Sequence, residues 1–173
     1  MEMIKISEDV TLDVKFQLST LDDREWRDVY FDICGYSDDS DDDASEILLG
    51  SCKGFTISLP VDHDHLTEIA DEISDECFSV CSEFQSFDDC ETLNYLVLTS
   101  MEIDKQFRGN GVGLKTMGLL YEYFWNYTIL IRPHPIKGTC EDVDGGIKKL
   151  QKYWMQSGFK QSGESQIFFK ECI

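Results

Sequence analysis

Residues 101–113 read Met-Glu-Ile-Asp-Lys-Gln-Phe-Arg-Gly-Asn-Gly-Val-Gly. The alternating apolar run from Tyr95 to Ile103 leads directly into this glycine-rich turn, and Leu114 to Phe124 follows with the pattern of a helix. A strand, a glycine turn and a helix N-terminus in this order commonly bind phosphate, because glycine lets the backbone approach the anion and the first N–H groups of the helix point at it. The stretch therefore predicts an anion site between Arg108 and Gly113.

Two other phosphate-binding motifs fit these glycines less well. A P-loop requires Lys and then Ser or Thr directly after its last glycine, whereas Leu114 and Lys115 follow Gly113 here. A dinucleotide fingerprint requires Gly-x-Gly-x-x-Gly, whereas these glycines recur at every second position. A turn that uses glycine for backbone geometry alone is the plain alternative.

The spacing Arg108-x-x-Gly111-x-Gly113 resembles the coenzyme A signature of the GNAT superfamily of N-acetyltransferases, which is Gln or Arg, two residues, Gly, one residue, then Gly or Ala. The run 152–159, Lys-Tyr-Trp-Met-Gln-Ser-Gly-Phe, is similar to the close of that family's penultimate helix. The resemblance implies an α/β fold with a GNAT-like mixed sheet: antiparallel N-terminal strands and central splayed parallel strands, flanked by helices.

The resemblance also implies a set of residues that hold acetyl-CoA, the co-substrate. The backbone amides of Met101 and Ile103 would face the pantetheine arm and the thioester. The pyrophosphate would be held by the turn, that is by Arg108, Gly109, Asn110, Gly111, Val112 and Gly113.

The remaining pattern predicts one α/β domain over residues 1–173, with a coenzyme A-binding core at 95–160 and a helical segment at 61–91 that lines the acceptor site. We expect an antiparallel meander of three strands, at 12–18, 29–33 and 46–59, the last bent at Gly50 or Gly54. A turn or short helix is expected at 21–27 and a helix from Leu66 to Cys77. The expected C-terminal elements are a strand at 128–131, a helix at 146–156 and a strand at 166–170.

Composition restricts the partners. The net charge of -19 argues against nucleic acid and anionic membranes and favours a cationic amine as acceptor, either a small molecule or a peptide. Acidity that serves only solubility is the plain alternative. Seven cysteines without a Cys-x-x-Cys pair predict reduced thiols and a cytoplasmic location, and a homodimer is possible. Neither the Asp-rich segment 37–45 nor Asp62-His63-Asp64-His65 has the spacing of a metal site, so no metal is expected.

The catalytic candidates are Glu102, His134 and Tyr153, the titratable side chains closest in sequence to the expected thioester. In family members that use a tyrosine as general acid, the matching position here is Trp154, and the position of a Glu base is matched by Val97. These departures leave a second hypothesis open: an acidic interaction protein that keeps the fold and binds coenzyme A without catalysis. A nucleic-acid mimic would in addition require carboxylates spaced like phosphates.

Overall fold

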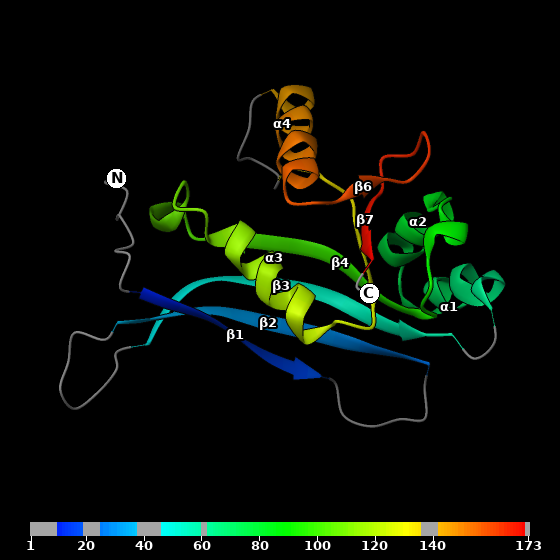
Figure 1. Ribbon diagram of the computed structural model, residues 1–173, viewed down its shortest axis with the longest axis horizontal. Helices are drawn as coiled ribbons and strands as arrows, with labels where there is room; N and C mark the ends of the chain where they lie inside the picture. The colour runs from blue at the N-terminus through cyan, green and yellow to red at the C-terminus, as the bar shows by residue number, and fades with distance from the viewer. Residues whose placement is uncertain (1–9, 19–24, 38–45, 60–61, 136–141, 172–173) are drawn as a thin grey trace.

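The computed structural model describes residues 10–18, 25–37, 46–59, 62–135 and 142–171, and these contain a mixed sheet of seven strands in the order β1-β2-β3-β4-β5-β7-β6 (Figure 1). The strands are β1 (Val10–Leu18), β2 (Trp26–Ser37), β3 (Glu46–Ser58), β4 (Asn94–Ile103), β5 (Thr128–Ile131), β6 (Lys160–Gln161) and β7 (Phe168–Glu171). The α-helices are α1 (Leu66–Ile73), α2 (Asp75–Glu83), α3 (Val112–Tyr123) and α4 (Val143–Gln156). Short 3-10 turns precede α1 (His63–His65), β4 (Phe87–Asp89) and α3 (Lys105–Phe107).

The strand directions confirm the expected α/β class and the antiparallel meander. Strands β1 to β4 pair antiparallel with their neighbours, whereas β4 and β5 pair in parallel, and β7 returns antiparallel to β5. The short connections of the meander allow only antiparallel pairing, while the β4–β5 connection is long enough to contain α3.

Both faces of the sheet are covered by helices, and the alternation of β4 shows how. Leu96 and Leu98 pack in one cluster with Leu120 of α3 and Trp154 of α4. Tyr95 and Val97 pack in the cluster on the opposite face, which also holds the buried residues of α1 and α2. In Figure 1, α3 crosses the long strands while α1 and α2 lie together at one end of the sheet. Burial on both faces explains why β4 has the continuous apolar run from Tyr95 to Leu98 before it alternates.

Two irregularities occur beside the glycines at which the bend was expected. The β2–β3 register shifts next to Gly50, and the β3–β4 register shifts between Lys53 and Gly54. Lys53 pairs with Ser100 and Gly54 with Leu98, so Thr99 is the extra residue of a β-bulge in β4. A Cβ on Gly54 would overlap the carbonyl oxygen of Val97, which is why the bulge needs glycine opposite it.

Several predicted boundaries were wrong. The single helix expected from Leu66 to Cys77 is two helices, because Ser74 is extended and its hydroxyl accepts a hydrogen bond from Cys77 N, capping α2. Trp26 and Arg27, which were expected in a turn or short helix, belong instead to β2, where Trp26 packs edge-on against Phe55.

Other boundaries lie outside the prediction or outside the described residues. Helix α4 begins at Val143, because Asp142 accepts a hydrogen bond from Gly145 N. Strand β6 had no sequence signal. Residues 21–24 and 38–45, which include most of the Asp-rich segment, lie outside the described residues. Within the described ranges, none of the helices is long and apolar enough to cross a membrane.

Candidate active site

The site lies where β4 and β5 separate. Their parallel pairing covers Tyr95–Leu98 and ends there, whereas β4 continues to Ile103 while paired with β3. Strand β5 ends at Ile131 and is followed by Pro133 and Pro135, which have no N–H with which to continue a ladder. The edge of β4 from residue 99 to 103 is therefore released from β5, and this creates a gap in the sheet.

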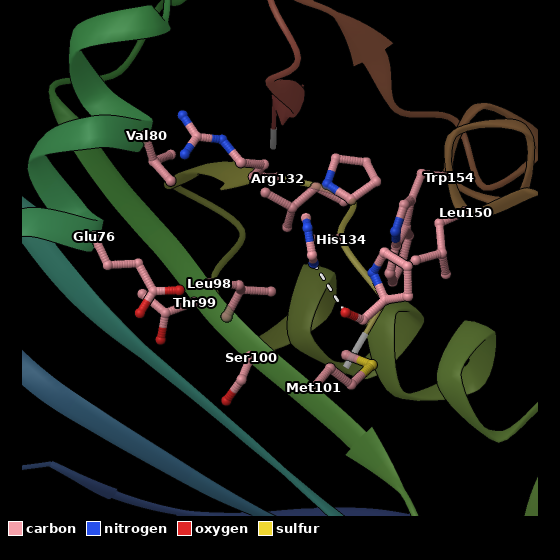
Figure 2. A pocket seen from close by; sticks show the side chains of 13 residues that line it. Glu76, Val80, Leu98, Thr99, Ser100, Met101, Arg132, His134, Leu150 and Trp154 are labelled. Carbon is pink, nitrogen blue, oxygen red and sulfur yellow. Dashed lines mark hydrogen bonds between the residues drawn. The ribbon is translucent and has the colours of Figure 1, made fainter. Parts of the chain in front are cut away.

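A cavity of about 470 Å³ opens in this gap (Figure 2). Its walls come from α2, the bulged part of β4, the end of β5 and α4. Lining it are Glu76, Val80, Leu98, Thr99, Ser100, Met101, Ile131, Arg132, Pro133, His134, Pro135, Leu150 and Trp154. We call it the gap cavity.

A second cavity, of about 560 Å³, adjoins the first, and we call it the turn cavity. Met101, Leu150 and Trp154 line both. Seven of the eight residues predicted to hold the cofactor line the turn cavity, namely Met101, Ile103, Arg108, Gly109, Gly111, Val112 and Gly113. The structure thus brings these residues together along one surface that continues into the gap.

The geometry of the turn explains its glycines. Gly109 and Gly111 have φ values of 82° and 73°, a left-handed backbone conformation that residues with a side chain rarely adopt. Gly111 is also the N-cap of α3. Nothing lies within 4 Å of a Cβ placed at either position, so the space in front of the helix is open. Asn110, the eighth predicted residue, does not line the cavity. Its side-chain amide instead donates to the Phe107 carbonyl at 3.1 Å and so shapes the turn.

Arg108 is held at the end of β4. Its Nε donates to the carbonyl of Ile103 at 2.7 Å, and its Nη2 lies 3.6 Å from a carboxylate oxygen of Glu102. Glu102 is exposed and lines neither cavity. Its carboxylate is therefore directed at Arg108 and away from the gap.

Tyr153 belongs to α4, and its hydroxyl reaches the N-terminus of α3 in the turn cavity. A Cβ on Gly113 would be only 2.9 Å from the Tyr153 hydroxyl oxygen, so the third glycine leaves room for this phenol. Partial burial raises the pKa of Tyr153, while a hydrogen bond from the backbone of Leu114 opposes this rise in pKa. The phenol therefore stays protonated, and its oxygen accepts a hydrogen bond from the Leu114 N–H, one of the amides at the start of α3 that have no partner within the helix.

His134 lies in the gap cavity. Its Nδ1 is 2.9 Å from the carbonyl oxygen of Pro135. A carbonyl only accepts, so Nδ1 is the donor, and Nε2 carries the lone pair of the neutral ring. Of the three catalytic candidates, the structure thus brings His134 to the gap cavity, Tyr153 to the turn cavity and Glu102 to neither.

Sequence reasoning missed the side chains that α2 brings to the gap cavity. Glu76 and Val80 are one helical turn apart and face it together. The helix is fixed there by Arg132, which donates to the Ser79 hydroxyl at 2.9 Å, the Ser79 carbonyl at 2.8 Å and Glu83 Oε1 at 2.7 Å. Arg132 follows β5 directly, and a side chain at the carboxyl end of a parallel strand is a recognised signal for a site. Nothing local to α2 indicated Glu76.

The His-Asp run before α1 makes local contacts at the helix start. Asp62 accepts from Asp64 N and lies 3.1 Å from His65 Nδ1, and this contact raises the pKa of His65. His63 contacts the Tyr95 hydroxyl through Nδ1 at 2.5 Å. The described ranges contain no group of three His, Cys, Asp or Glu side chains placed to hold a metal ion.

Charge is distributed unevenly around the two cavities. Residues 62–91, which include α1 and α2, contain eleven Asp and Glu and no Lys or Arg. The segments 105–115 and 143–152, which include the turn and most of α4, contain six cationic side chains: Lys105, Arg108, Lys115, Lys148, Lys149 and Lys152. The turn side thus suits an anionic ligand and the α2 side a cationic one.

Comparison of the chain with models of known protein families, with curated proteins and with solved structures finds no match. The assignment of a function therefore depends on the geometry and chemistry of the two cavities.

Proposed function

We propose that this protein is an acetyl-CoA-dependent N-acyltransferase of GNAT type. The observation that carries the proposal is the pair of adjoining cavities: one begins at a glycine-capped helix, and the other lies in the gap between two parallel strands. A ligand with an anionic end and a narrow arm that ends in a reactive group suits this shape, and coenzyme A has that form.

The residues present fit coenzyme A. The open space over Gly109 and Gly111, together with the N–H groups at the start of α3, suits a pyrophosphate. The released edge of β4, from Thr99 to Ile103, offers backbone groups to the amides of the pantetheine arm. The thioester would then lie near Met101 and Trp154, where the two cavities meet.

The reaction requires little of the protein. The nitrogen lone pair of a free amine forms a bond to the thioester carbonyl carbon, the C–S bond breaks, and the sulfur leaves with its electron pair. Because an alkylamine is mostly protonated at neutral pH, a group in the gap cavity must first receive its proton. Backbone N–H groups on β4 can stabilise the developing oxyanion. His134 is a candidate to relay a proton from the nitrogen to the leaving thiolate, since its ring lies in the gap cavity and its Nε2 can accept that proton.

The alternative is an acidic protein that binds coenzyme A without catalysis. It is favoured by two observations: Trp154, which cannot act as an acid, lies where the cavities meet, and Tyr153 is directed at α3. The two functions differ in one measurement, the release of free coenzyme A thiol from acetyl-CoA in the presence of amines.

The proposed function is tested by calorimetry with coenzyme A and by thiol release with a panel of amines. Gly111→Glu would place an anion where the pyrophosphate should lie and strain the left-handed N-cap, and we expect coenzyme A to bind at least tenfold more weakly. Gly118→Glu is the matched control, because Gly118 is exposed on the same helix with nothing near its Cβ, and it should bind normally. If the wild type does not bind coenzyme A, the proposal fails.

A further inference from the structure

The side of the gap cavity that α2 forms presents one carboxylate. Among the described residues that line this cavity, Glu76 is the only Asp or Glu. Within that same described lining, the other charged or titratable side chains are Arg132 and His134. Figure 2 shows the Glu76 side chain reaching from α2 with its carboxylate directed toward Thr99 of β4, while Leu150 and Trp154 lie on the α4 side.

Other carboxylates close to the site are already engaged. Glu83 bonds to Arg132 at 2.7 Å, and Glu102 lies beside Arg108. Within the described residues, the contacts include no ion pair to Glu76. A carboxylate that faces a cavity and has no cationic partner in the protein can bind a cationic group of a ligand.

Contacts of α2 hold the backbone that carries Glu76, while the Glu76 side chain itself is exposed. Glu76 belongs to the first turn of α2. Ser74 caps this helix, and Cys77 and Val80 anchor it in the core. The helix N-terminus also stabilises a carboxylate in its first turn. Facing Glu76, Thr99 is the extra residue of the β-bulge, and its hydroxyl donates to the Lys53 carbonyl at 3.4 Å. Bulges of this kind redirect side chains next to active sites.

We propose that Glu76 receives the acceptor: it binds the cationic amine and takes its proton, directly or through one water. The inference rests on the proposed function and adds that the acceptor enters from the α1–α2 side, opposite the turn that would hold the cofactor. The ammonium gives one proton through Glu76 to solvent. The nitrogen then bonds to the carbonyl carbon, the C–S bond breaks, and the leaving sulfur takes up the second nitrogen proton as a thiol.

The test compares Glu76→Gln with Glu72→Gln, in the full chain, with acetyl-CoA and a primary amine. Both side chains are exposed, and both changes remove one negative charge from the same acidic region, but Glu72 on α1 lines neither cavity. We expect Glu76→Gln to lower kcat/KM by about 10²–10⁴-fold, as for loss of a general base. Glu72→Gln should stay within about threefold of the wild type, well below that range. Coenzyme A affinity should be unchanged in both.

The pH dependence separates Glu76 from the other groups in the cavity. The acidic limb of the kcat/KM profile should move toward the pKa of the amine itself in Glu76→Gln and stay in place in His134→Ala. An acidic limb that stays in place in Glu76→Gln, or turnover within threefold of the wild type, would overturn the inference while leaving the acyltransferase proposal intact. Absence of both coenzyme A binding and thiol release from the wild type would instead overturn the proposed function, and with it the role of Glu76.

Discussion

Tyr153 and Trp154 are neighbours on α4, yet Tyr153 lines the turn cavity alone, whereas Trp154 lines both cavities. Successive residues of a helix point about 100° apart, so the two rings cannot share one direction. Trp154 is buried in the cluster under α3 and borders both cavities, while Tyr153 reaches the N-terminus of α3. The tyrosine is therefore better placed to contact a phosphate than a thiolate.

A prediction about Tyr153 follows from this position. Tyr153→Phe should weaken coenzyme A binding by about two- to tenfold, the range for loss of one hydrogen bond, and change kcat little.

His134→Ala should do the opposite, lowering kcat with the affinity for coenzyme A nearly unchanged. Glu102→Gln should alter neither by more than a small factor, because its carboxylate is exposed and paired only with Arg108. Calorimetry and steady-state kinetics on the three variants check the set, and a Tyr153→Phe protein with normal affinity but much reduced kcat would contradict it.

At the scale of the elements, the bulge in β4 sets which side chains enter the gap. Ile103 lines only the turn cavity and Met101 lines both cavities, whereas Thr99 and Ser100 line the gap cavity. A strand without the extra residue would place its side chains on the opposite faces after Leu98. Gly54 makes the bulge possible, because only hydrogen fits beside the Val97 carbonyl.

Gly54→Ala should therefore destabilise the protein by about 1–3 kcal/mol, the usual cost of forcing extra atoms into a packed site. Gly118→Ala makes the same chemical change at an exposed position of α3, where alanine is the better helix former, and should stabilise by about 0.5–1 kcal/mol. Urea denaturation measures both. Equal effects of the two substitutions would show that the contact with Val97 is relieved at no cost.

At the scale of the whole molecule, the uneven charge predicts opposite electrostatic environments for donor and acceptor. A linear triamine should be favoured over a monoamine of equal length at low salt, because residues 62–91 attract additional positive charge. The advantage should shrink as salt rises, since attraction between exposed charges is screened over about 10 Å at 0.1 M and about 3 Å at 1 M. KM measured for both amines across that range tests the prediction. A preference for the triamine that is indifferent to salt would refute it.

Buried thiols predict a loss of stability at high pH. Burial raises the pKa of Cys52 from 9.0 to about 12, so the folded state keeps a proton that the unfolded state releases above about pH 9. The unfolded state then binds fewer protons, and the free energy of unfolding falls as pH rises. Cys52 alone should contribute about 1.4 kcal/mol per pH unit between these values.

The measurement is the slope of unfolding free energy against pH between about pH 9 and 11, the window above the pKa of an unfolded thiol. Cys52→Ala should make this slope shallower by the contribution of that one thiol. Ser51→Ala changes the neighbouring residue of β3 without removing a titrating group, and it should leave the slope as it is. Identical slopes for the wild type and Cys52→Ala would show that the thiol ionises equally in both states.

Local signals were sufficient for much of this protein. The alternation of 95–103, the glycines and the apolar spacing of 114–124 predicted a strand, a turn and a helix, because each depends on neighbours within a few residues. The meander was predictable for the same reason, since short connections allow one pairing. Boundaries failed where a side chain competed with the pattern, as Ser74 does by capping α2 within a continuous apolar spacing.

The gap cavity was decided by the tertiary structure alone. It requires β4 to extend beyond the end of β5, and it requires a bulge in β4 that exists only through the pairing with β3. It also requires α2, residues 75–83, to lie at the end of β5, where Arg132 holds it. Glu76 carries no distinguishing neighbours in the sequence, where it is one of eleven acids between residues 62 and 91. Which of those carboxylates faces the gap depends on contacts between residues far apart in the chain, and no local pattern encodes such contacts.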